Sequence, residues 1–225
     1  MDIDPSLFLI IKFVHVLIFV YWLGGDLGVW IAGKYMQRSE LSIDERIRAR
    51  EIGILVDMAP RTCNVLMVPV GFTLASSWGS PLPGWFIAFI WIFSAGWLWM
   101  VWEIHKRRKD PGVKALMKHD LNVRYVVGTT ILVYGLYNLF GGGPIEEQWL
   151  AAKIMLYGLI LFTGIWIRKS IVDVSPYYAM IRAGGDQKEE GEAKLRAARK
   201  KVEPPVLTIW ALVAAMGFLG VVKPF

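Results

Sequence analysis

Long apolar runs alternate with short polar segments along the whole chain. A run of about 18–20 uncharged residues is long enough to cross the hydrocarbon core of a bilayer as a helix. The pattern therefore predicts an all-α fold, a polytopic membrane helical bundle that forms one integral membrane domain over residues 1–225. The six expected transmembrane helices have the approximate bounds 7–30, 52–78, 85–104, 123–140, 145–167 and 205–222.

Prolines and glycines mark several helix boundaries. Asp4 and Pro5 predict the start of the first helix, because an aspartate caps a helix N-terminus and proline suits its first position. Two prolines, Pro60 and Pro69, predict a kinked second span. A polar segment at 173–203 contains a Gly-Gly break followed by a charge-rich helical stretch, and the next two residues, Pro204-Pro205, are expected to begin the last span.

The basic residues predict a topology. Lysine and arginine are concentrated in the first, third and fifth connections and are absent from the second and fourth. Cytoplasmic loops of membrane proteins are enriched in these residues. We therefore expect both termini outside, the basic connections and the segment 173–203 in the cytoplasm, and a location in a bacterial inner membrane.

Composition supports this class. The chain has 225 residues, 55% of them hydrophobic, and a mean hydropathy of +0.44. The net charge of +6 comes from basic residues beside the spans, so we expect the lipid bilayer as a partner and no nucleic acid. Cys63 is the only cysteine, which excludes an intrachain disulfide, and no zinc-type spacing occurs.

One face of the first span is polar. At about 100° per residue, Lys12, His15, Trp22 and Asp26 fall within roughly 80° of each other. An ionisable group in hydrocarbon costs at least a few kcal/mol, so such groups need partners or a function. At 1.5 Å per residue, His15 lies about 15 Å and Lys153 about 13 Å into helices that enter from outside. The two residues can therefore line one cavity if their helices adjoin. A structural hydrogen bond from His15 to a neighbouring helix is the alternative.

A second polar layer is expected near the cytoplasmic side. It consists of Asp26, Asp57, Arg61 and Asn64. The last three are spaced 4 and 3 residues apart and share a helix face, where Asp57 and Arg61 can pair. This cluster can lock two helices together structurally. It can also anchor the anionic groups of a ligand or carry protons.

Histidine placement limits the cofactor chemistry. No second deep histidine faces His15. A haem bound there would be five-coordinate, or its sixth ligand would be Lys153 or a methionine such as Met67 or Met155. Nucleotide-binding, zinc-protease and serine-hydrolase motifs do not occur.

Three short stretches resemble the HemJ-type protoporphyrinogen oxidases. They are a Lys-x-x-His first helix with a tryptophan seven residues after the histidine, a later Trp-x-x-x-Lys helix, and a Lys-Pro ending. The second span is similar only through Pro60 and Gly71. The positions that carry the resemblance in the three stretches are Lys12, His15, Trp22, Gly25, Trp149, Lys153, Lys223 and Pro224.

The resemblance implies a membrane helical protein that binds b-type haem through the first-helix histidine and oxidises a porphyrinogen. We therefore predict haem b as the cofactor, with His15 as the ligand of the haem iron and Lys153 as a catalytic residue. Trp22, Lys153 and Arg61 are the further predicted cofactor-binding residues.

The chain also departs from that family. Residues 79–143 add a helix pair without a counterpart. Ile31 stands near the place of an expected arginine, Asp26 is unexpected, and an Asn-Glu pair is reduced to Glu203. The copper-resistance D-type membrane proteins have a similar first helix. Shared fold is therefore better supported than shared activity.

These observations predict a haem-b-binding membrane oxidoreductase with a porphyrin-type or quinone substrate, either as a homo-oligomer or within a larger membrane complex. One alternative is a non-enzymatic accessory or assembly subunit of such a complex. Another is a transporter of a metal or a small solute.

Overall fold

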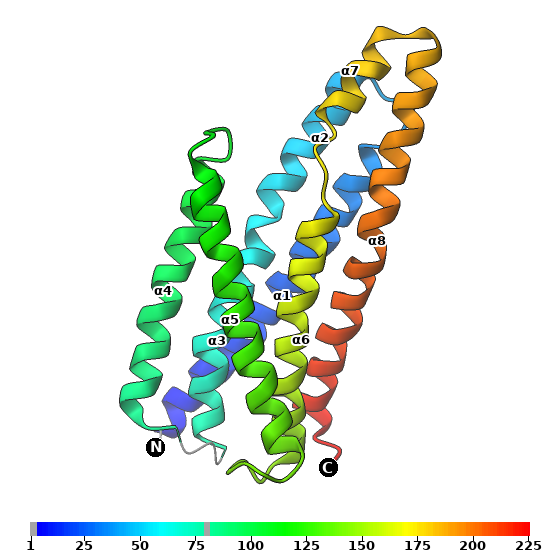
Figure 1. The fold of residues 1–225 in the computed structure, drawn as a ribbon. Coiled ribbons are helices and arrows are strands. Elements are labelled where there is room, and N and C mark those ends of the chain that lie inside the picture. The colour runs from blue at the N-terminus through cyan, green and yellow to red at the C-terminus, as the bar shows by residue number, and fades with distance from the viewer. Residues whose placement is uncertain (1–3, 79–81) are drawn as a thin grey trace.

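The computed structural model describes residues 4–78 and 82–225, and these are helical without any strand. Figure 1 shows the helices packed side by side in one elongated bundle. The bounds of the helices are α1 Pro5–Tyr35, α2 Ile43–Val56, α3 Met58–Ser76, α4 Gly84–Lys106, α5 Val113–Leu139, α6 Gln148–Ser170, α7 Ser175–Ala183 and α8 Gly185–Val222.

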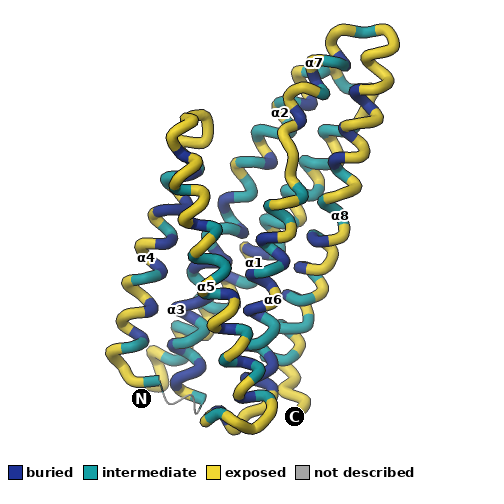
Figure 2. The backbone as a smooth tube through the Cα atoms, in the orientation of Figure 1, coloured by how far each residue is buried: buried dark blue, intermediate teal, exposed yellow. Residues whose placement is uncertain are grey.

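Four stretches are long and apolar enough to cross a membrane, namely Pro5–Tyr35, Gly84–Lys106, Gln148–Ala183 and Gly185–Val222. Large apolar side chains are exposed on the outer helices, for example Ile92, whose exposed fraction is 74%. Figure 2 shows exposed positions running along the outer sides of α4 and α8. Lipid contact explains this exposure, so the chain has the character of an integral membrane protein.

Two of the expected spans, α3 and α5, are not among these four stretches. Most of α3 is buried, because it packs against α1 on one side and α4 on the other. A helix shielded from lipid can carry polar residues such as Arg61 and Asn64, which lower its mean hydropathy. The total of six spans stays a prediction.

The helices are arranged so that the start of α1 and the end of α8 lie at the same end of the bundle (Figure 1). The end of α3 and the α5–α6 connection are also found there. The α1–α2 and α4–α5 connections and α7 lie at the opposite end. Within the bundle, α6 packs between α5 and α8, while α1 packs against α2 and α3.

The second expected span is divided into α2 and α3 at Asp57. The interruption follows from Pro60, which has no N–H to donate to the carbonyl of Val56 four residues earlier. Pro69 lies inside α3 without ending it, and the carbonyl of Pro69 accepts a hydrogen bond from Thr73 Oγ1 at 2.7 Å. Of the two prolines, Pro60 therefore interrupts the expected span, whereas Pro69 does not.

The last helix is longer than the expected span. It begins at Gly185, just after Gly184, whose φ of +80° interrupts the chain as expected, and it continues through Pro204 and Pro205 to Val222. The carbonyls that lose a donor to these prolines belong to the exposed Lys200 and Lys201, where water can replace the missing bond.

The end of the bundle with the α1–α2 and α4–α5 connections is rich in lysine and arginine and is called the basic end below. The polar segment packs there as a helical extension. α7 and the first half of α8 lie against α2, around a small hydrophobic cluster. Buried residues of this cluster are Val174, Tyr178, Ile181, Leu195 and Ala198. Beside it, Arg46 and Glu192 form a buried ion pair at 2.6 Å.

Candidate functional site

A cavity of about 340 Å³ lies between α1, α3, α6 and α8, with one residue from α5. Its volume falls in the range of small-molecule pockets, about 300–1,000 Å³. The walls are mainly apolar and aromatic, and they include Phe8, Phe19, Phe72, Trp78 and Trp149. The cavity occupies the half of the bundle that holds both chain ends, because Phe8 and Lys223 lie near the termini.

Three lysines contribute to this cavity, and none of its described lining residues is acidic. Lys12 comes from α1, Lys153 from α6, and Lys223 follows the end of α8. The ammonium nitrogen of Lys223 lies 3.3 Å from the ring centre of Trp78 and 4.9 Å from that of Trp149. Cation–π contacts of this kind stabilise the charge only partly. The described ionisable side chains thus give the cavity a basic lining.

Lys153 reaches toward α8 at a glycine. A Cβ atom at Gly220 would lie 2.6 Å from the Lys153 ammonium nitrogen. The same nitrogen lies 6.0 Å from the ring centre of Trp149, one helical turn earlier on α6. A glycine at 220 thus leaves room for the lysine head inside the cavity.

His15 of α1 lines the cavity, and one nitrogen of its ring is buried. Its Nδ1 atom is buried and has no hydrogen-bond partner among the described residues. Gly71 of α3 lies opposite, and a Cβ there would be 3.8 Å from His15 Cε1. A buried nitrogen without a partner costs about 1–3 kcal/mol, which a ligand could offset. The structure thus brings His15 and Lys153 to one cavity, and it shows no structural hydrogen bond at Nδ1.

Trp22 and Tyr157 close the inner end of the cavity. Trp22 is 3% exposed, and its ring meets that of Tyr157 edge-on at a centroid distance of 6.5 Å. The Tyr157 hydroxyl donates a hydrogen bond to the Asn64 carbonyl at 2.5 Å. This hydrogen bond joins α6 to α3 beside the cavity.

Of the three side chains considered as a sixth haem ligand, two line the cavity. Lys153 and Met67 are lining residues, whereas Met155 is not. Arg61 also lies outside the lining. The structure places it in the second polar layer, apart from the cavity.

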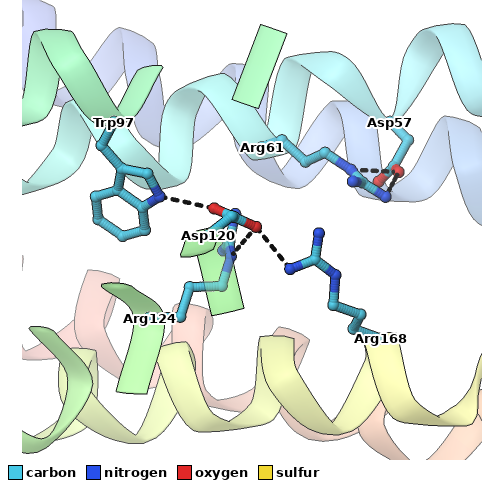
Figure 3. Close-up of polar contacts among 6 residues, drawn as sticks. All are labelled: Asp57, Arg61, Trp97, Asp120, Arg124 and Arg168. Carbon is cyan, nitrogen blue, oxygen red and sulfur yellow. Dashed lines mark hydrogen bonds and ion pairs between the residues drawn. The ribbon is translucent and has the colours of Figure 1, made fainter. Parts of the chain in front are cut away.

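The second polar layer contains an ion pair at the start of α3. Arg61 Nε lies 2.6 Å from Asp57 Oδ2 (Figure 3). Asp26 lies near Asp57 but makes no ion pair within the described part of the chain. The Asn64 side-chain oxygen is buried without a partner in the same part. The four predicted residues therefore share a region but do not form one bonded cluster.

A buried carboxylate on α5 was missed by the sequence analysis. Asp120 is 1% exposed and accepts hydrogen bonds from Trp97 Nε1 at 2.9 Å, Arg124 Nε at 3.1 Å and Arg168 Nη1 at 2.6 Å (Figure 3). The i,i+4 spacing of Asp120 and Arg124 in the sequence is typical of an ion pair within one helix. The group ties α4, α5 and α6 together, and we interpret it as structural.

The described residues contain no group of three or more histidine, cysteine or carboxylate side chains placed to hold a metal ion. No protein-family model, curated protein or solved structure matches the chain. The resemblance to the HemJ-type protoporphyrinogen oxidases and to the copper-resistance D-type proteins therefore stays a prediction from short motifs.

Proposed function

We propose that this integral membrane protein binds haem b in the cavity between α1, α3, α6 and α8 and acts as an oxidoreductase. His15 would be the axial ligand of the iron. The observation that carries the proposal is the position of His15 in the lining of an apolar, aromatic cavity whose other described lining residues include three lysines and no carboxylate.

The lining residues fit the chemistry of haem. A porphyrin has a large apolar ring, two carboxylates and an iron that accepts a nitrogen ligand. The aromatic walls suit the ring, and lysines 12, 153 and 223 can pair with the carboxylates. Three lysines in a cavity with no acidic side chain among its described lining residues repel one another when charged, and a bound dianion would relieve that repulsion.

Four lining residues have defined tasks in this proposal. His15 would hold the iron, and Trp22 with Tyr157 would exclude water from the end of the cavity farthest from the chain termini. Lys153, at the depth of His15, can hold a proton beside the substrate and so serve as the catalytic residue. Bound haem supplies a redox centre for a porphyrin-type or quinone substrate.

An absorption spectrum of the purified protein tests the proposal. We expect a Soret band, either as purified or after titration with hemin, and we expect His15→Ala to abolish it. His119→Ala is the matched control, because His119 is exposed on α5 outside the cavity. A native protein that gains no Soret band in either experiment would contradict the proposal.

A second substitution separates binding from turnover. Lys153→Met should retain the Soret band while electron transfer from a reduced quinone or porphyrinogen falls. If Lys153→Met keeps full turnover, Lys153 has no catalytic role even when haem is bound.

A further inference from the structure

A second pocket lies at the basic end of the bundle, between α2 and α7. Its volume is about 210 Å³. It shares no lining residue with the cavity that contains His15. The lining residues are Ile47, Arg50, Ser175, Tyr178, Ala179 and Arg182.

The charge of this pocket is incompletely balanced. Arg50 contacts Glu51 only at 3.8 Å, and Glu51 is held more closely by Arg108, at 2.9 Å. Arg182 pairs with Asp44 at 2.8 Å, but both side chains are mostly exposed, so this pair can exchange partners at little cost. Among the residues that the structure describes, the pocket therefore has an arginine without a close partner and a second one that is weakly held.

Tyr178 adds an unused hydrogen-bonding group. Its exposed fraction is 5%, and its hydroxyl is buried with no hydrogen-bond partner in the described ranges 4–78 and 82–225. Burial raises the pKa of Tyr178 above its usual value of 10.0, so the hydroxyl keeps its proton and can act as a donor. Behind the ring, Arg46 is already neutralised by Glu192 and does not compete for a ligand.

The position of the pocket along the bundle places it at the membrane surface. Arg50 lies two residues before the expected span 52–78, and the apolar Ile52 and Leu55 just beyond it are 59% and 65% exposed. On the other side, the exposed Ile171 and Val172 lie in the short connection that leads from α6 to α7. The pocket thus lies where lipid-facing surface gives way to polar surface, which is the level of lipid headgroups.

We propose that this pocket binds a phosphate ester, either the headgroup of an anionic phospholipid or a soluble phosphate ester. Arg50 and Arg182 pair with the phosphate oxygens, and the hydroxyl of Tyr178 donates a hydrogen bond to them. The site is separate from the proposed haem cavity and does not depend on it.

The test uses the full-length protein in nanodiscs of phosphatidylcholine with and without phosphatidic acid. Retained lipid is measured by native mass spectrometry, and the melting temperature is measured in parallel. We expect the native protein to retain phosphatidic acid and the double variant R50Q/R182Q to weaken retention by about tenfold or more, because charge-assisted hydrogen bonds are lost. Tyr178→Phe, which removes only the unpartnered hydroxyl, should weaken retention by a smaller factor.

Arg48→Gln is the matched control, because Arg48 is exposed on the same helix and does not line the pocket. Competition by glycerol 3-phosphate would assign the site to a soluble phosphate ester, and lack of competition to a lipid headgroup. The proposal is overturned if neither compound binds. It is equally overturned if Arg48→Gln weakens binding as much as the double variant does.

Discussion

At the scale of single residues, the buried pair of Arg46 and Glu192 determines how the polar extension is attached. Two parallel hydrogen bonds join the side chains at 2.6 and 2.9 Å, and Arg46 Nε also donates to the Met36 carbonyl at 2.7 Å. Arg46 is 1% exposed, so an arginine that loses its carboxylate there would be a buried unpaired charge.

Glu192→Ala should therefore lower the stability of the α2, α7 and α8 extension by about 3–5 kcal/mol. Glu190→Ala, which removes an exposed pair with Lys194, should cost at most about 1 kcal/mol. Hydrogen exchange of these helices measures the difference. Equal protection in the two variants would show that the Arg46–Glu192 pair does not hold the extension in place.

The same pair predicts acid sensitivity. The hydrogen bonds from Arg46 hold the pKa of Glu192 below its usual value of 4.5. A carboxylate with a lowered pKa in the folded state stabilises it above the unfolded pKa, and this stabilisation is lost as the pH falls through the folded value. The protection factors of the α7 amides, which correct for the intrinsic pH dependence of exchange, should therefore fall below about pH 4.5 in the native protein. Glu192→Gln should show no such fall.

Some site residues were predictable individually. His15 and Lys153 are evident from the sequence because ionisable residues are rare inside apolar runs. The i,i+4 spacing allows Asp120 to pair with Arg124, but Asp120 lies just before an expected span, where a polar residue is ordinary, so its burial was not predictable. Its partners Trp97 and Arg168 are 23 and 48 residues away in the chain, so no local pattern joins them to it.

At the scale of elements, glycines set the contact between α5 and α6. A Cβ at Gly158 would lie 2.7 Å from the backbone Cα of Leu132, and one at Gly135 would clash with the backbone of Met155. Close backbone approach at small residues is a common basis of helix association in membranes. The α5–α6 interface therefore has no room for larger side chains at these positions.

Gly158→Ala should destabilise the protein by about 1–3 kcal/mol, because the two helices must move apart. Gly164→Ala on the same helix meets nothing within 4 Å and should be neutral or stabilising by up to about 1 kcal/mol. Thermal unfolding in detergent compares the two variants. A Gly158→Ala protein as stable as the Gly164→Ala protein would show that the interface can relax.

Helix boundaries were only partly predictable, because proline ends a helix at one position and lies within a continuous helix at another. Pro60 ends α2 at Val56, whereas Pro204 and Pro205 are accommodated within α8. The local sequence contains the proline in both cases. It does not show whether the freed carbonyl can reach water or whether tertiary packing keeps the helix continuous.

At the scale of the whole molecule, hydropathy cannot show which helices adjoin. Apolar residues that face lipid and those that face another helix look alike in a sequence. Only two residues of α1, Ile18 and Trp22, are buried, yet its composition resembles that of a core helix. The cavity between α1 and α6 therefore required the three-dimensional arrangement.

The predicted topology can be tested with cysteine labelling, because the buried Cys63 is the only cysteine. A Cys63→Ala background accepts single cysteines at exposed positions, which an impermeant thiol reagent labels in intact cells only from outside. If α1, α3, α4, α5, α6 and α8 all span, Ser6→Cys, Ser77→Cys and Phe225→Cys should be labelled. Lys109→Cys and Asp186→Cys should react only after permeabilisation.

Positions 77 and 109 decide between six spans and four. If α3 and α5 do not cross, Ser77 would remain in the cytoplasm and Lys109 would face outside, while both termini would keep their side. We expect the six-span pattern, because the connection near Lys109 is basic and lies at the same end of the bundle as α7. Labelling of Lys109→Cys in intact cells, with Ser77→Cys protected, would contradict it and would leave α3 and α5 without a transmembrane role.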